Sequence, residues 1–137
     1  PAYLAEHGTP QRVDELAQRN CLTHSYFGHS LWSFTRKSDG APVSVAVDGN
    51  VSANDAASLM GLARAGAGIA MLPTYLTAQL VHGGELVPLF PDFEPQVVGM
   101  YAVYTSRKHM PATLRTMLDF LAQRFTEVPA WDLPLAA

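Results

Sequence analysis

The first candidates for a chemical role are Cys21, His24 and His29, which could bind zinc, because thiolate and imidazole are good zinc ligands. The Cys-x-x-His spacing with His29 nearby fits no standard zinc pattern, and a fourth ligand is not evident. We therefore predict no metal site and interpret Cys21 as a small buried residue at a strand edge. Two interpretations remain for His24 and His29: they belong to a binding cleft or hinge, or they are ordinary loop histidines.

Nucleophilic catalysis would need Cys21 or a serine beside a base and an orienting acid. The sequence contains no Gly-x-Ser-x-Gly elbow. Gly66-x-Gly68 lacks the longer glycine pattern of a nucleotide fingerprint and follows a predicted helix, which is the wrong order. We therefore predict no catalytic residues and no cofactor, and we do not expect an enzyme.

Residues 51–73 contain the best binding candidate, at the start of a predicted helix. Ser52 followed by Asp55 has the spacing of a capping box, which satisfies backbone N–H groups of a first helical turn. The remaining N–H groups and the positive dipole end attract carboxylates and phosphates, so Ser52, Ala53 and Asn54 would line a site for an anionic ligand. The alternative is that these residues only cap the helix.

The elements around this helix predict an α/β domain. The helix should bury one apolar face, end at a left-handed glycine, Gly66, and lead into a buried strand at 68–72 that Pro73 ends. The predicted face consists of Ala56, Leu59, Met60 and Ala63. Upstream, residues 1–7 should be helical, Thr9 should cap a second helix, and residues 31–36 and 43–47 should form a hairpin.

Downstream, we predict a helix at 74–82, a strand at 85–90, a turn at the lobe boundary and a buried strand at 97–105. Pro111 should open an amphipathic helix whose apolar stripe is formed by Leu114, Met117, Leu118, Leu121 and Phe125.

Composition favours a folded globular protein, with 48% hydrophobic and 15% charged residues. A net charge of −3 gives no electrostatic footprint for nucleic acid, so this chain should not bind DNA unaided. We find no membrane-spanning run and no export signal, and one cysteine fits a reducing compartment, so we predict a cytoplasmic location without membrane association.

The order of several short motifs is similar to that of a known family. The motifs are the segment 1–10, Asp14-Glu15-Leu16-Ala17, Asn20-Cys21-Leu22, Trp32 with Phe34, Asn54-Asp55, the run 65–73, Gly84-Glu85-Leu86, residues 101–105 and Leu118-Asp119-Phe120-Leu121. Together they resemble the effector-binding domain of LysR-type transcriptional regulators, up to about Phe125.

The resemblance implies a type 2 periplasmic-binding-protein-like fold, in which two α/β lobes enclose a small effector. Residues 1–96 would be one complete α/β lobe, the second lobe of the domain. Residues 97–125 would be a strand and helix of the other lobe, and residues 126–137 a carboxy-terminal tail. The loop before the Asn54 helix faces the effector cleft in similar proteins.

The resemblance further implies a transcription regulator that senses a small-molecule effector, forms a homo-oligomer and binds DNA only through a helix-turn-helix domain absent from this chain. The alternatives are a solute-binding protein of the same fold and an enzyme. The apolar stripe after Pro111 should pack against another copy or against further chain, since an uncovered stripe is unfavourable by roughly 25 cal/mol per Å².

Overall fold

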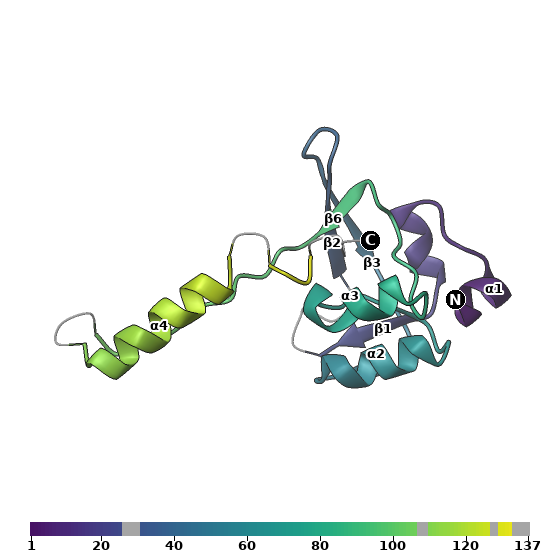
Figure 1. The fold of residues 1–137 in the computed structure, drawn as a ribbon. Helices are drawn as coiled ribbons and strands as arrows, with labels where there is room; N and C mark the ends of the chain where they lie inside the picture. The colour runs from purple at the N-terminus through teal and green to yellow at the C-terminus, as the bar shows by residue number, and fades with distance from the viewer. Residues whose placement is uncertain (26–30, 107–109, 127–128, 133–137) are drawn as a thin grey trace. The chain divides into compact units, whose positions relative to one another are not determined.

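The described residues up to 97 form two small sheets, three α-helices and one 3₁₀ helix (Figure 1). The computed structural model describes residues 1–25, 31–106, 110–126 and 129–132. The chain divides into two compact units, Pro1–Val97 and Val98–Ala137, which we describe separately.

Strand β1 (Cys21–His24) is the centre of a parallel sheet, with β4 (Ser52–Ala53) on one side and β5 (Ile69–Ala70) on the other. Helix α2 (Ala56–Arg64) connects β4 to β5, as parallel strands require a crossover. Leu59, on the predicted apolar face of α2, is fully buried. The predicted α/β unit is therefore present.

The end of α2 follows the prediction for Gly66. Its φ of 81° is a left-handed conformation that suits glycine. The Gly66 amide donates to the carbonyl of Ala63, and the Ala67 amide donates to that of Leu62. These two bonds form a Schellman motif, which turns the chain from α2 into β5.

Strand β5 is shorter and less covered than predicted. Only Ile69–Ala70 is a strand, and both residues are half-buried rather than covered on both faces. The reason is its place in the sheet, since β5 pairs with β1 and has no described strand on its other side.

The second sheet is antiparallel and contains the predicted hairpin, β2 (Leu31–Arg36) and β3 (Pro42–Ala46). Its third strand, β6 (Phe93–Pro95), pairs with β2. The inner side chains of the hairpin meet the 3₁₀ helix η1 (Val13–Gln18) in the main core. That core contains Val13, Leu16, Cys21, Trp32, Phe34, Val45 and Val47.

Two predictions around these elements are wrong. Helix α1 (Ala2–His7) is confirmed, but the next helix is η1, which begins after Arg12 rather than at a Thr9 cap. Residues 85–90 form no strand after helix α3 (Thr74–His82), because the amides of Glu85 and Leu86 both donate to the carbonyl of Leu80 and continue the helix end.

The unit Val98–Ala137 contains the predicted helix, α4 (Ala112–Arg124), with Pro111 at its N-cap. No residue of α4 is fully buried. Leu114, Leu118 and Leu121 of the predicted stripe are half-buried, whereas Met117 and Phe125 are exposed.

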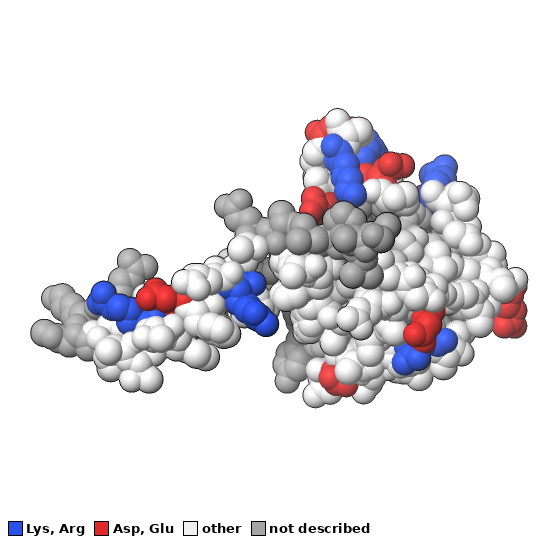
Figure 2. Space-filling model, in the orientation of Figure 1, with Lys and Arg blue, Asp and Glu red and all other residues white. Residues whose placement is uncertain are grey.

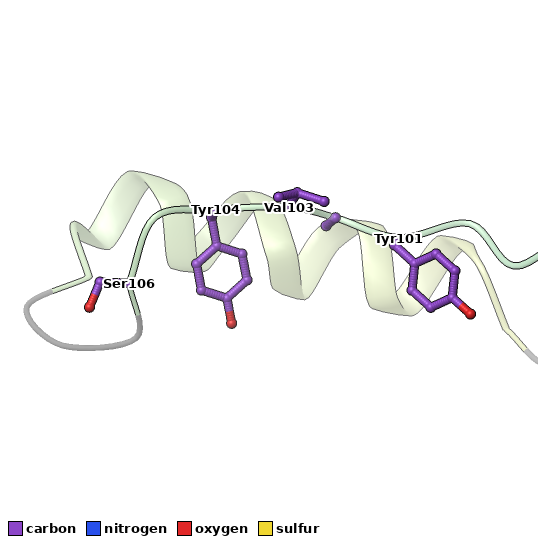
Figure 3. A pocket seen from close by; sticks show the side chains of 5 residues that line it. Tyr101, Val103, Tyr104 and Ser106 are labelled. Carbon is purple, nitrogen blue, oxygen red and sulfur yellow. The ribbon is translucent and has the colours of Figure 1, made fainter.

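The strand predicted at 97–105 is absent. Val103 is 94% exposed and Tyr101 84%, because none of the described residues offers the neighbouring strand that a ladder needs. Figure 3 shows Tyr101 and Tyr104 projecting to the same side of this segment, although regular strand alternation would place them on opposite sides. A β-type sequence pattern without a partner has therefore not produced a strand.

Candidate functional site

Strands β1 and β4 end side by side at the start of α2. Their parallel register places Thr23 opposite Ser52 and His24 opposite Ala53. The Ser25 amide extends the pairing, donating to the carbonyl of Ala53 over 2.9 Å. In open α/β sheets, ligands bind outside the carboxyl ends of the strands. Four of the predicted site residues, His24, Ser52, Ala53 and Asn54, thus lie at one sheet end, where a ligand is expected.

Ser52 and Asn54 are exposed, while His24 and Ala53 are half-buried. Solvent therefore reaches the polar side chains of the site. The fifth predicted residue, His29, lies outside the described residues.

The cap of α2 differs from the predicted capping box. Asp55 is the N-cap, and its carboxylate accepts from the Ser58 amide at 2.8 Å and from the Ser58 hydroxyl at 2.7 Å. Ser52 belongs to β4 and pairs with β1, so its extended backbone lies too early to cap the helix. The Ser52 side chain therefore does not cap α2, contrary to the prediction.

Asp55 also sets the charge at this helix end. The hydrogen bonds from the Ser58 hydroxyl and amide lower the pKa of Asp55 below its ordinary value, and His24 adds a smaller effect in the same direction. The carboxylate is therefore charged at neutral pH and already stabilises the positive end of the helix dipole. A bound anion would share the helix end with this carboxylate.

Asn20 holds the two neighbouring strands to β1, a role that no sequence pattern indicated. Its side-chain amide donates to Asn50 Oδ1 at 2.9 Å and to the Ala67 carbonyl at 2.6 Å, while its Oδ1 accepts from the Asn50 amide at 2.9 Å. Asn50 precedes β4 and Ala67 precedes β5. Asn20 therefore fixes where both strands begin, and with β4 it positions Ser52 and Ala53.

Cys21 is a structural residue. Its side chain is fully buried, burial raises the pKa of the thiol to about 12, and Sγ donates to the Leu16 carbonyl. A neutral, enclosed thiol is a poor nucleophile and a poor metal ligand. The burial prediction is confirmed, but Cys21 begins the central strand of its sheet rather than lying at an edge. Among the described residues, no group of His, Cys, Asp and Glu could hold a metal ion.

A hollow of about 550 Å³ lies along residues 101–106 (Figure 3). Its lining comes from one exposed segment, which includes Tyr101, Val103, Tyr104 and Ser106. A site normally gathers residues from several elements into a concave pocket. We therefore do not assign a binding site to this hollow.

Comparison with known families identifies the chain. A family described as "LysR substrate binding domain" matches residues 1–126. The chain belongs to the LysR substrate-binding domain family. This identification confirms the resemblance and the type 2 periplasmic-binding-protein-like α/β fold class.

Curated relatives of this LysR substrate-binding domain are transcriptional regulators, not enzymes. The regulator CrgA of Neisseria meningitidis serogroup C is 34% identical over 125 residues, which cover 90% of this chain and 41% of CrgA. The probable regulator LtrA of Klebsiella pneumoniae is 29% identical over 126 residues, which cover 89% of this chain and 40% of LtrA. The chain thus spans about two fifths of the length of these relatives.

Solved structures agree with this assignment of the LysR substrate-binding domain. The full-length virulence activator AphB of Vibrio cholerae superposes with a TM-score of 0.75 at 26% identity, covering 88% of this chain and 41% of AphB. The regulatory domain of CrgA from Neisseria meningitidis gives a TM-score of 0.69 at 32% identity, covering 90% of this chain and 60% of that domain.

Proposed function

We propose that this chain is the effector-sensing part of a LysR-type transcriptional regulator, with the effector bound at the carboxyl ends of β1 and β4. The observation that carries the proposal is the parallel register, which brings His24 beside Ala53 and both beside the exposed Asn54 and Ser52. We also include His29 in the site, as predicted from the sequence, although this residue lies outside the described part of the chain.

The effector is a small molecule with an anionic group. The first-turn amides of α2 favour a carboxylate or phosphate, and the exposed hydroxyl of Ser52 and amide of Asn54 can donate to it. Asp55 limits this preference, so we place the anion toward Ser52 and Asn54 rather than over the Ser58 cap.

DNA binding and assembly belong to the longer protein. The regulator acts in the cytoplasm as a homo-oligomer, and a separate helix-turn-helix domain contacts DNA. On the face shown in Figure 2, Lys and Arg alternate with Asp and Glu and no broad basic patch is visible. Ion pairs such as Arg36–Asp39 and Arg64–Glu85 neutralise several of the cations. No described helix is long and apolar enough to cross a membrane.

The two units correspond to different lobes of the domain. Residues 1–96 form the second lobe, and residues 97–125 return to the first lobe, where the exposed apolar segment 97–105 would gain the partner strand that it lacks here. The division of the chain after Val97 and the exposure of Val103 support this assignment. Residues 126–137 form the carboxy-terminal tail, in which Trp131 makes an edge-to-face contact with Phe125, the C-cap residue of α4.

Ser52→Ala and Asn54→Ala in the full-length protein test the effector site. The probes are a panel of small carboxylic acids, and the readouts are a reporter response and DNA affinity without added acid. Both variants should weaken the response to an active acid while leaving DNA affinity nearly unchanged. Ser44→Ala, an exposed serine on β3, is the matched control. Equal loss of response and DNA affinity would indicate a folding role instead.

A further inference from the structure

A residue with left-handed backbone precedes β6, shortly before the end of the unit Pro1–Val97. Phe90 has a φ of 56°, and among the described residues no other non-glycine residue has a positive φ. This conformation is rare for a bulky side chain, and Pro91 makes it rarer, because a following proline favours extended backbone. The Phe93 amide donates to the Phe90 carbonyl at 2.9 Å, which closes a turn of residues 90–93 that we call the Phe90 turn. Strained backbone of this kind is concentrated at functional and switching sites, so the turn is a candidate for a conformational role.

Contacts from the core and from the hairpin hold the Phe90 turn closed. On the core side, the Phe90 ring packs edge-on against Phe34 of β2, with the ring centroids 6.3 Å apart. On the hairpin side, the Lys37 amide donates to the Asp92 carbonyl at 2.9 Å, and Lys37 Nζ donates to the Pro91 carbonyl at 2.8 Å. Strain at Phe90 favours release of the turn, and these contacts oppose its release.

The Phe90 turn leads directly into β6, whose one partner among the described strands is β2. Just before the end of the unit at Val97, the Gln96 amide donates to the Ser33 carbonyl of β2. Strand β2 belongs to the hairpin that lies, in chain order, between β1 and β4, the two strands of the proposed effector site. The hairpin thus connects the strands of that site with the segment that continues beyond Val97.

We propose that the Phe90 turn is a two-state switch. In the closed state it aligns β6 on β2 and couples the site strands to the chain beyond Val97, and in the open state it releases β6 and uncouples them. Strain at Phe90 shifts this equilibrium toward the open state by roughly 5- to 150-fold relative to an unstrained turn. The turn therefore opens more readily than the β2–β3 pairing, because those two strands, which are fully described, contain no residue with positive φ. The coupling rests on the proposed function, whereas the existence of the two states does not.

Two substitutions that both remove the Phe90 ring isolate the effect of backbone strain. Phe90→Gly relieves the left-handed conformation, whereas Phe90→Ala retains it, so the closed turn should be more stable with glycine. In the full-length protein, we expect the amides of Lys37 and Gln96 to exchange with solvent roughly 3- to 10-fold more slowly in Phe90→Gly than in Phe90→Ala. The Arg36 amide, which donates to the Ala41 carbonyl across the hairpin, is the reference and should exchange at nearly the same rate in both variants.

Three exchange results would overturn the proposal. Equal or faster exchange in Phe90→Gly would show that residue 90 is not held in a left-handed conformation. An Arg36 amide that changes as much as the Lys37 and Gln96 amides would show that the whole sheet opens rather than the turn. Unprotected Lys37 and Gln96 amides in the unsubstituted protein would show that the turn is not closed.

Coupling is tested in the same variants with the panel of small carboxylic acids. Phe90→Ala should keep the shifts that an active acid causes in the His24 and Asn54 amides but lower the reporter response at least about threefold, and Phe90→Gly should lower it less. Ser38→Ala, at an exposed position next to Lys37, is the control and should change neither readout. A full response in Phe90→Ala, or loss of the amide shifts together with the response, would contradict the coupling. If no acid shifts these amides in the unsubstituted protein, the proposed function fails, and the exchange comparison still decides whether the turn is a switch.

Discussion

Replacing Asn20 by alanine should destabilise the parallel sheet on both sides of β1. The substitution removes two hydrogen bonds from the side-chain amide, to Asn50 Oδ1 and the Ala67 carbonyl, and one bond that Oδ1 accepts from the Asn50 amide. The segments that lead into β4 and β5 would then lose their shared attachment. The effect should therefore reach the proposed site through β4.

The size of the effect follows from these three bonds. A hydrogen bond contributes roughly 0.5–1.5 kcal/mol net, and the two bonds to Asn50 are exposed, which places them at the lower end. The bond to Ala67 is short and partly buried, and its loss leaves the carbonyl poorly solvated. We expect a total loss of about 2 kcal/mol in the free energy of unfolding.

Urea unfolding of the full-length protein, followed by tryptophan fluorescence, measures this loss. With an m-value of about 2 kcal/mol/M, the midpoint of the transition that reports Trp32 should fall by about 1 M. Asn54→Ala is the control, because Asn54 is exposed and the structure assigns its side chain no hydrogen bond among the described residues. A midpoint for Asn20→Ala within about 0.2 M of that for Asn54→Ala would refute the reasoning.

Three further predictions concern backbone packing, the helix cap and the buried thiol. Gly68→Ala should lower the Tm, because the new Cβ would lie 2.5 Å from the Asn20 carbonyl oxygen. Gly61→Ala in α2 is the control and should not lower the Tm, because a Cβ there meets nothing within 4 Å. A fall in Tm for both variants would argue against the close approach at Gly68. Asp55→Ala should lower the urea midpoint at neutral pH through loss of the Ser58 cap. Because the pKa of Asp55 is lowered in the folded protein, the cap stabilises the fold above the unfolded pKa of about 3.9, and this stabilisation is lost as pH falls through the folded pKa. A difference in urea midpoint between Asp55→Ala and the unsubstituted protein that persists at pH ~2 would contradict this role of Asp55. Cys21 should react with a thiol reagent at pH ~8 only after unfolding, since burial raises its pKa to about 12; rapid labelling of the native protein would be inconsistent with this burial.

Features set by neighbouring residues could be predicted from the sequence. The hairpin, the Gly66 helix end, α3 and α4 all follow from patterns within a few residues of one another, and the structure confirms each. Ser52, Ala53 and Asn54 could be predicted together because they precede a helix in the sequence. Their position beside His24 depends on the register of β1 and β4, which sequence spacing does not specify.

Features that depend on distant partners could not be predicted in the same way. Residues 97–105 have β-type composition but no described partner strand, whereas Phe93–Pro95 contains a proline and still forms β6, because β2 offers an edge there. Asn20 was part of the family resemblance, yet its bonds to Asn50 and Ala67 join positions far apart in the chain. The capping prediction for Ser52 was wrong for a related reason, since pairing with β1 outcompeted the local pattern.

The most direct test of the account is an NMR titration of the full-length protein with a small carboxylic acid that alters its reporter response. The account predicts saturable shifts of the amides of His24, Ala53 and Asn54, with loss of these shifts in Asn54→Ala at the same acid concentration. An active acid that leaves these three amides unmoved, while shifting amides elsewhere in the protein, would contradict the assignment of the effector site to the ends of β1 and β4.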